Sequence, residues 1–159
     1  MNNETIINKL KDGNKQYVKG GIIGDVSKNR RIDTYLNGQS PFALVITCSD
    51  SRVIPEVIFQ QGIGDLFVVR VAGNVVDEFV LGSIEYAIEH LSITCVVVLG
   101  HKNCGAVSSC LNHASGRYVN KLIERISQNI KNDKDYDKAI ELNVKAEVLN
   151  LKQAFATFK

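Results

Sequence analysis

The chain has 159 residues, of which 45% are hydrophobic and 23% are charged, enough apolar material for the core of one globular domain. Its formal net charge is +2, and its lysines and arginines are scattered, which argues against a nucleic-acid or anionic-membrane partner. No apolar run is long enough for a signal peptide or a membrane span, and the four cysteines are expected to be reduced thiols. We therefore expect a cytoplasmic protein with a single domain over residues 1–159.

An amino-terminal helix is predicted over about residues 4–18, with Asn3 as its cap and with Ile6 and Leu10 on its apolar side. The next stretch, GGIIGDVSKNRR (residues 20–31), is rich in glycine and polar residues and is predicted to form turns. We expect the helix to pack on the rest of the domain.

Residues 40–112 are predicted to form an α/β core. Three short apolar runs rich in strand formers indicate buried strands: PFALVITC (41–48), DLFVVRVAG (65–73) and ITCVVVLG (93–100). Apolar residues between positions 77 and 91 recur with the spacing of an amphipathic helix. Strands that alternate with helices are typical of parallel pairing with right-handed crossovers. We therefore predict an α/β fold with a central, mostly parallel β-sheet flanked by α-helices.

The carboxyl-terminal part, about residues 118–153, is predicted to be helical. A short helix is expected after Gly105, a second over the apolar repeat from residue 119 to 130, and a last one over the repeat from residue 140 to 151. No internal repeat, low-complexity tract or linker divides the sequence.

Residue types that bind metals follow two of the predicted strands at their carboxyl ends. Cys48 ends the first strand, and His101 and Cys104 come directly after the third. In open parallel sheets the ligand crevice lies outside the carboxyl ends of the strands, so we expect these side chains to meet. Two thiolates and an imidazole are ligands of the kind that zinc prefers. The sequence thus predicts a zinc site with three protein ligands.

The fourth position on the metal decides between two states of such a site. If Asp50 fills it, the site is closed; if water fills it, zinc lowers the pKa of that water to about 7 and provides hydroxide at neutral pH. Arg52 can hold the Asp50 carboxylate through two charge-assisted hydrogen bonds and turn it away from the metal. Both states of Asp50 are compatible with the sequence.

Each group taken alone also has an ordinary structural explanation. Cys48 can be a buried thiol, as we expect for Cys95 and Cys110, because free cysteine is among the most buried residue types. Asp50 and Arg52 can form a local ion pair. The position of both clusters at the same predicted sheet edge is what favours a metal site.

The segments CSDSR, which begins at Cys48, and GHKNCG, which contains His101 and Cys104, together resemble the beta-class carbonic anhydrases. In that family Cys-x-Asp-x-Arg followed by His-x-x-Cys supplies the zinc site. The resemblance implies one Zn²⁺ per chain, bound by Cys48, His101 and Cys104. It also implies that Asp50 and Arg52 form the family's dyad, with Asp50 either on the metal as a fourth ligand or released to the arginine.

The resemblance extends to a substrate pocket and to an activity. Gln39 in GQSP, Phe67 in LFVVRVAGN and Tyr86 in SIEYA match pocket residues of plant-like members. Gly105 matches a pocket glycine, while Phe67 and Tyr86 would also suit a core. The implied activity is reversible hydration of carbon dioxide to bicarbonate and a proton by zinc-bound hydroxide. The family's basic unit is a dimer with pockets at the subunit interface, so a homodimer or an assembly of dimers is expected.

The chain departs from the family pattern in three respects, one of which is that RVAGN stands where many members have an arginine, an asparagine and then the alanine. Members usually continue with a further helix and an edge strand. Some bacterial members have a tryptophan in a non-catalytic bicarbonate site, whereas this sequence contains no tryptophan. Two alternative functions use the same residues: a non-catalytic zinc-binding domain closed by Asp50, and a zinc hydrolase acting on another small heteroallene such as carbon disulfide. A thiol enzyme with Cys48 as nucleophile is disfavoured, because Arg52 has the wrong spacing for a cysteine-phosphatase loop and no Cys-x-x-Cys pair is present.

Overall fold

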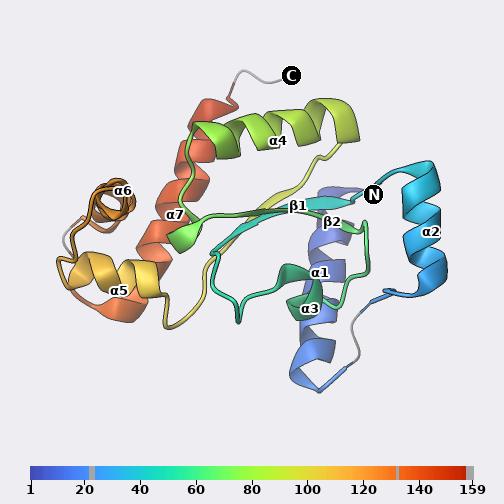
Figure 1. Cartoon of the computed structure of the whole chain (residues 1–159), viewed down its shortest axis with the longest axis horizontal. Coiled ribbons are helices and arrows are strands. Elements are labelled where there is room, and N and C mark those ends of the chain that lie inside the picture. Colours follow the sequence, from blue (N-terminus) through green and yellow to red (C-terminus); the bar gives the residue numbers. More distant parts are fainter. Residues whose placement is uncertain (22–23, 132, 157–159) are drawn as a thin grey trace. The chain divides into compact units, whose positions relative to one another are not determined.

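A computed structural model of the chain describes residues 1–21, 24–131 and 133–156 (Figure 1). The chain forms two compact units, each made of three segments. The first unit comprises Met1–Val45, Arg52–Val69 and Gly82–Val97, and the second comprises Ile46–Ser51, Arg70–Leu81 and Val98–Lys159. A single domain over residues 1–159 stays a prediction. Across the described ranges, no helix combines the length and the apolar character needed to cross a membrane.

Three strands form one sheet in the order β2-β1-β3. Their bounds are Ala43–Thr47 for β1, Leu66–Arg70 for β2 and Val96–Leu99 for β3. The strands are parallel and helices flank them, so the predicted α/β fold is confirmed. All residues of the central strand β1 are buried, as expected for a continuous apolar run inside a parallel sheet. Each strand begins in the first unit and ends in the second, so the carboxyl ends of all three belong to the second unit.

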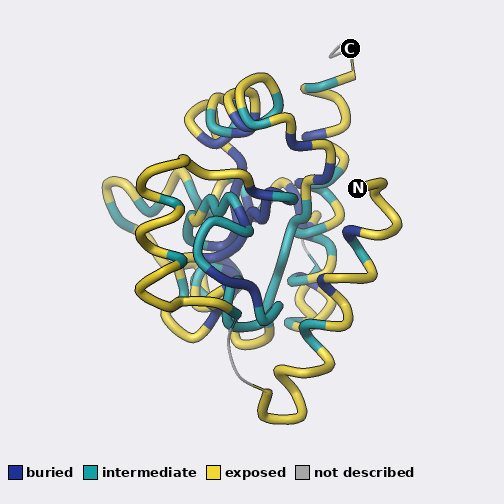
Figure 2. Tube along the Cα trace, turned by 90° about the vertical axis from the view of Figure 1, so that its right-hand side faces the viewer, coloured by how far each residue is buried: buried dark blue, intermediate teal, exposed yellow. Residues whose placement is uncertain are grey.

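Helices of the first unit include the predicted amino-terminal helix. They are α1 (Asn3–Val18), α2 (Lys28–Asn37), α3 (Pro55–Ile58) and the part of α4 (Glu78–Leu91) from residue 82 onward. The cap of α1 is Asn2 rather than the predicted Asn3, because the Asn2 side chain accepts a hydrogen bond from the Thr5 N–H at 2.8 Å. Ile6 and Leu10 are buried, while most of this helix, which follows the N label in Figure 2, is exposed.

Helix α2 corrects the prediction of turns over residues 20–31, of which 22–23 lie outside the described residues. The Ser27 side chain caps this helix by accepting a hydrogen bond from the Arg30 N–H at 3.1 Å. Arg30 in turn donates from Nε to the carbonyl oxygen of Ile63 at 2.8 Å, in the loop before β2. This distant partner anchors a helix that buries none of its own residues, which is why its apolar pattern did not predict it.

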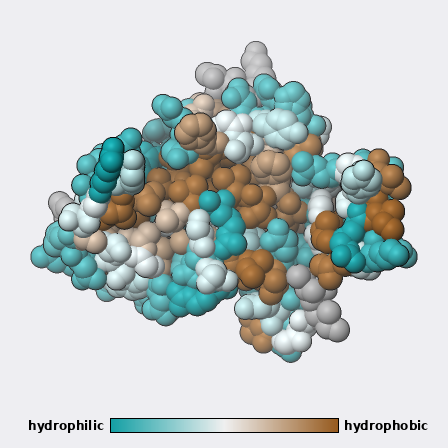
Figure 3. All heavy atoms as spheres, in the orientation of Figure 1, coloured by the Kyte–Doolittle hydropathy of each residue, from teal (hydrophilic) through white to brown (hydrophobic). Residues whose placement is uncertain are grey.

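Large apolar side chains of α2 are exposed. Ile32, Tyr35 and Leu36 have exposed fractions of 46%, 86% and 70%. Hydrophobic atoms gather over this helix on the face shown in Figure 3. Exposed apolar surface of this kind is typical of a region that another protein covers.

Helices of the second unit confirm the predicted helical carboxyl-terminal part. They are α5 (Gly105–Leu111), α6 (Val119–Ile130) and α7 (Tyr136–Ala154), which pack on one another (Figure 1), preceded by the 3₁₀ turn η1 (Ala72–Asn74). The core of this unit contains Cys48, Val75, Cys104, Val107, Cys110, Ile126, Ile130 and Ala139. Two of the three predicted zinc ligands therefore lie in the hydrophobic core of one unit.

Two glycines of the first unit provide a matched test of its packing. In α1, a Cβ added at Gly13 would lie 1.8 Å from the carbonyl oxygen of Phe59, the residue after α3. In α4, a Cβ added at Gly82 meets nothing within 4 Å. Alanine favours helix at either site by about 0.5–1 kcal/mol, but overpacking typically costs about 1–3 kcal/mol.

We predict that Gly13→Ala lowers the free energy of unfolding in urea and that Gly82→Ala raises it by up to about 1 kcal/mol. A stabilising effect of both substitutions would contradict the close approach of α1 to the Phe59 backbone.

Candidate metal centre

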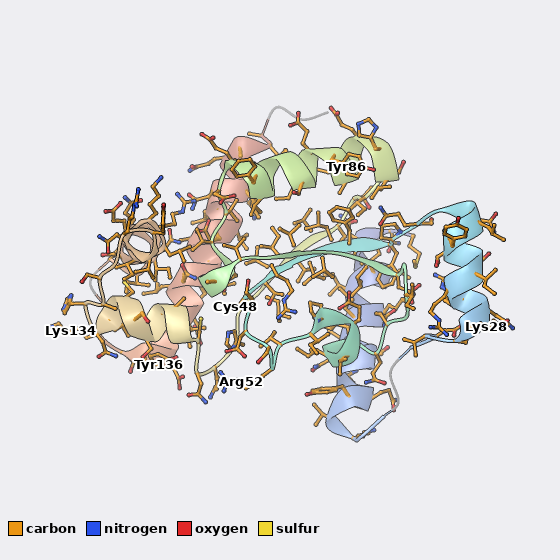
Figure 4. All side chains as sticks on the ribbon, in the orientation of Figure 1. Lys28, Cys48, Arg52, Tyr86, Lys134 and Tyr136 are labelled. Carbon is orange, nitrogen blue, oxygen red and sulfur yellow. The ribbon has the colours of Figure 1, made fainter. Side chains whose placement is uncertain are left out.

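The three predicted ligands come together in the second unit. Cys48 directly follows β1 (Figure 4), and His101 and Cys104 lie in the loop between β3 and α5. One ligand atom from each of these residues lies within 4.8 Å of the other two. Cys48 and Cys104 are only 4% and 1% exposed. The strand ends therefore bring side chains from distant parts of the sequence into one buried cluster.

The spacing of the two sulfurs suits a tetrahedral metal. The Sγ atoms of Cys48 and Cys104 are 3.9 Å apart, and both thiols are free. Zinc binds thiolates at about 2.3 Å, and tetrahedral angles then place two sulfurs about 3.8 Å apart. Cys95 and Cys110 are buried outside the cluster, as expected for structural thiols.

The His101 ring presents a nitrogen that lacks a protein partner. Its Nδ1 lies 2.9 Å from the Lys102 carbonyl oxygen, which places the ring proton on Nδ1 as donor and leaves Nε2 unprotonated. Within the described part of the chain, Nε2 is buried without a hydrogen-bond partner. A buried polar atom of this kind is costly unless something satisfies it, and a cation does so. The donor set of one imidazole and two thiols fits Zn²⁺.

The two thiols differ in acidity because they share a hydrogen bond. That bond holds the pKa of Cys48 well below its ordinary range, assisted by the Gly73 N–H and opposed by burial. The same bond raises the pKa of Cys104, and burial raises it further. Without a metal the pair therefore shares one proton at neutral pH.

Arg70 and Gly73 hold the Cys48 loop and were not among the predicted site residues. Arg70 donates from Nε to the Cys48 carbonyl oxygen at 3.1 Å and from Nη2 to the Asp50 carbonyl oxygen at 2.6 Å. The Gly73 N–H donates to Cys48 Sγ at 3.2 Å. Gly73 has φ 69°, and a Cβ there would lie 2.8 Å from Ile126 Cδ1, so this position favours glycine. A glycine shortly after a strand, in RVAGN, is the sequence signal for such a bend.

Helix α7 packs directly on the loop that carries the other two ligands. Tyr136, labelled in Figure 4, donates its hydroxyl hydrogen to the Cys104 carbonyl oxygen at 2.8 Å. A Cβ added at Gly100 would lie 2.5 Å from Val144 Cγ2, so the loop and the helix touch without space for a side chain. These contacts were not predicted, because they join residues far apart in the sequence.

Asp50 lies at the edge of the cluster. Its Oδ2 is 4.0 Å from His101 Nε2, too far for a hydrogen bond, and its carboxylate is not one of the clustered ligand groups. Arg52 belongs to the first unit. The roles of Asp50 as fourth ligand and of Arg52 as its partner therefore stay predictions.

The predicted pocket residues are divided between the two units. Gly105 begins α5 directly after Cys104. Gln39, Phe67 and Tyr86 belong to the first unit, where Gln39 is exposed. The ring centroids of Phe67 and Tyr86 are 6.3 Å apart. Their assignment to a substrate pocket stays a prediction.

Comparisons with known proteins agree on one family. The family model for carbonic anhydrases matches residues 43–158. A carbonic anhydrase of Mycolicibacterium smegmatis is 43% identical over 126 residues, which cover 76% of this chain and 61% of that protein. One of Pseudomonas aeruginosa is 38% identical over 136 residues, covering 72% and 60%. The chain thus spans less than two thirds of the length of these curated relatives.

Solved structures extend the likeness to nearly the whole chain. A beta-carbonic anhydrase of Coccomyxa, solved in complex with acetazolamide, is 30% identical with a TM-score of 0.70, covering 92% of this chain and 74% of that chain. A beta-carbonic anhydrase of Aspergillus fumigatus is 25% identical with a TM-score of 0.73, covering 98% and 80%.

The shared proton predicts how zinc binding depends on pH. Between pH 7 and 8 the lowered pKa of Cys48 leaves it ionised without metal, whereas the raised pKa of Cys104 keeps that thiol protonated. Zinc binding then releases about one proton from the pair, so affinity rises about tenfold per pH unit. Two ordinary thiols would release two protons and give a rise of about a hundredfold. Zinc titration against a chelator across this range distinguishes the two slopes, and the steeper one would contradict the shared proton.

Proposed function

Because the chain belongs to the beta-class carbonic anhydrase family, we propose that it catalyses the reversible hydration of carbon dioxide to bicarbonate and a proton. The observation that carries the proposal is the buried cluster of Cys48, His101 and Cys104, in which His101 Nε2 lacks a protein partner. A buried nitrogen without a partner is unfavourable in a hydrophobic core, but together with two thiols it can bind a metal cation.

We assign one Zn²⁺ per chain to Cys48 Sγ, His101 Nε2 and Cys104 Sγ. Three protein ligands leave a fourth position, which is the feature that separates catalytic from closed structural zinc sites. The metal supplies Lewis-acid chemistry there, lowering the pKa of a water molecule to about 7 and so providing a nucleophile at neutral pH.

We assign to Asp50 and Arg52 the role of determining whether water or the Asp50 carboxylate occupies the fourth coordination position of the zinc. Held by Arg52, the Asp50 carboxylate stays ionised, and one of its Oδ atoms accepts the hydrogen bond that orients the nucleophile. Turned toward His101, the same carboxylate closes the site. In support, Asp50 Oδ2 is 4.0 Å from His101 Nε2, and Arg70 fixes the Asp50 carbonyl oxygen, which confines the switch to the side chain.

The substrate pocket is assigned to four residues that match the family's pocket. Carbon dioxide is small and apolar, so a dry wall and a donor are enough to receive it. Gln39 supplies the donor, Phe67 and Tyr86 supply the wall, and Gly105 supplies its backbone. The contact between the two aromatic rings supports a joint apolar surface.

The working form is proposed to be a homodimer or an assembly of dimers. The exposed apolar side chains of α2 support this proposal, because a second copy would remove them from water. A cytoplasmic location is proposed with it, since that compartment keeps the thiols reduced.

The metal assignment predicts opposite outcomes for two buried cysteines of the second unit. Cys48→Ser should lose bound zinc and carbon dioxide hydration together, whereas Cys110→Ser should retain about one zinc per chain. Elemental analysis and stopped-flow hydration measure both properties. Acetazolamide, which the Coccomyxa protein binds, should inhibit the wild type. Retention of zinc and activity by Cys48→Ser would overturn the ligand assignment.

The switch assignment predicts that Arg52→Ala keeps its zinc and loses activity. Without its partner, Asp50 binds the metal more readily and closes the site, so the hydration rate should fall at least about tenfold. Arg52→Lys keeps the charge without the planar fork and should lie in between.

Wild-type activity in Arg52→Ala would contradict the switch. A wild type that binds zinc fully and hydrates nothing would instead indicate the closed, non-catalytic domain. Activity on carbon disulfide in the same assay would indicate the related hydrolase.

A further inference from the structure

A polar network is buried between α6 and α7, away from the predicted site residues. Glu147 is 0% exposed, Asn143 is 1% exposed and Asn129 is 8% exposed. Arg125 forms two hydrogen bonds with the Glu147 carboxylate, from Nε at 3.0 Å and from Nη2 at 2.9 Å. Burying a carboxylate is costly unless it is paired and hydrogen-bonded, so this arrangement calls for a role beyond filling space.

The network fixes the orientation of one amide group. Asn129 Nδ2 donates both to Glu147 Oε1 and to Asn143 Oδ1, each at 2.8 Å. Because the Asn143 oxygen is thereby occupied as an acceptor, its Nδ2 must face the other way. That nitrogen donates to the Gly73 carbonyl oxygen at 2.8 Å.

Gly73 connects this amide to the metal cluster. Its carbonyl oxygen accepts from Asn143, and its N–H donates to Cys48 Sγ at 3.2 Å. The residue sits at φ 69°, a bend that only surrounding contacts hold in place. A continuous path of hydrogen bonds therefore runs from Glu147 to a predicted zinc ligand by way of Asn129, Asn143 and Gly73.

We propose that Asn143 is a positioning residue for Cys48: it holds the Gly73 bend so that the Gly73 N–H stays aimed at the sulfur. The inference rests on the proposed zinc site and assigns a new role within it. A hydrogen bond to a ligating sulfur fixes the direction of the sulfur lone pairs and withdraws charge from them, which sets the strength of the metal–sulfur bond. Asn129 and Glu147 act behind Asn143 by fixing its amide.

The second loop of the cluster has an equivalent contact from the same helix. Tyr136 donates to the Cys104 carbonyl oxygen and stands seven residues before Asn143, so the two side chains share one face of α7. One helix face thus reaches the backbone beside both thiol ligands.

The test compares Asn143→Leu with Asn150→Leu, the same substitution on the same helix. Asn150 Nδ2 also donates to Glu147, at 3.2 Å, whereas the side chain that donates to the Gly73 carbonyl oxygen is that of Asn143. Leu151→Ala, at a buried site of α7, serves as a stability-matched control. Each variant is loaded with Co²⁺, and the energy of the thiolate-to-cobalt charge-transfer band is measured. A second sample is loaded with Zn²⁺, and the rate at which zinc dissociates into excess chelator is measured.

Asn143→Leu is expected to speed zinc release about 10- to 100-fold, because the sulfur is no longer held in its ligating direction. It is also expected to move the charge-transfer band to lower energy, because the sulfur loses the donor that withdraws its charge. Asn150→Leu and Leu151→Ala should leave both unchanged. If Asn143→Leu does not fold, Asn143→Ser, whose hydroxyl is too short to reach Gly73, takes its place.

Unchanged release and band in the Asn143 variant, or equal changes in all three variants, would overturn the positioning role. Failure of the wild type to bind either metal would overturn the proposed site and this inference together. Normal metal binding with no hydration would overturn the proposed activity alone.

Discussion

The arrangement of the second unit depends on two buried sulfur atoms, those of Cys48 and Cys104, which lie 3.9 Å apart. Neither can carry a full negative charge beside the other in a core without a compensating positive charge. The Gly73 N–H offsets part of that charge, and one retained proton offsets more. A metal ion held by these three side chains would take the place of the proton and would also pair with the imidazole nitrogen. The cluster thus places polar groups in a hydrophobic core, where apolar side chains are usual.

The sheet explains how this cluster is assembled. Because β1 and β3 are parallel neighbours, their carboxyl ends meet, and Cys48 and the His101 loop leave the sheet at the same edge. The backbone there is held by side chains that lie elsewhere, including Arg70 on the Cys48 loop and Tyr136 on the Cys104 loop. The clustered side chains are few, but the contacts that hold their loops come from several elements.

The sequence predicted what depends on local pattern. Strands, most helices and the clustering of Cys48, His101 and Cys104 followed from apolar runs, helical spacing and residue types at strand ends. Helix α2 was missed because Arg30 anchors it through the distant Ile63 carbonyl group rather than through an apolar face. Gly73 and Asn143 were missed for a related reason: their contacts join residues far apart in the chain, and neither residue type points to a metal site by itself.

Tyr136 and Asn143 connect helix α7 to the two loops of the cluster. Docking of this helix and binding of a metal ion are therefore thermodynamically coupled. If docking of the helix favours the metal-binding arrangement of the loops, then binding of the metal must favour docking by the same free energy. Helix α7 contributes none of the clustered ligand residues. Its amide protons should nevertheless exchange with solvent more slowly once a metal ion binds to the cluster. Helix α7 would then report the binding of an ion to which it contributes none of the clustered ligand atoms.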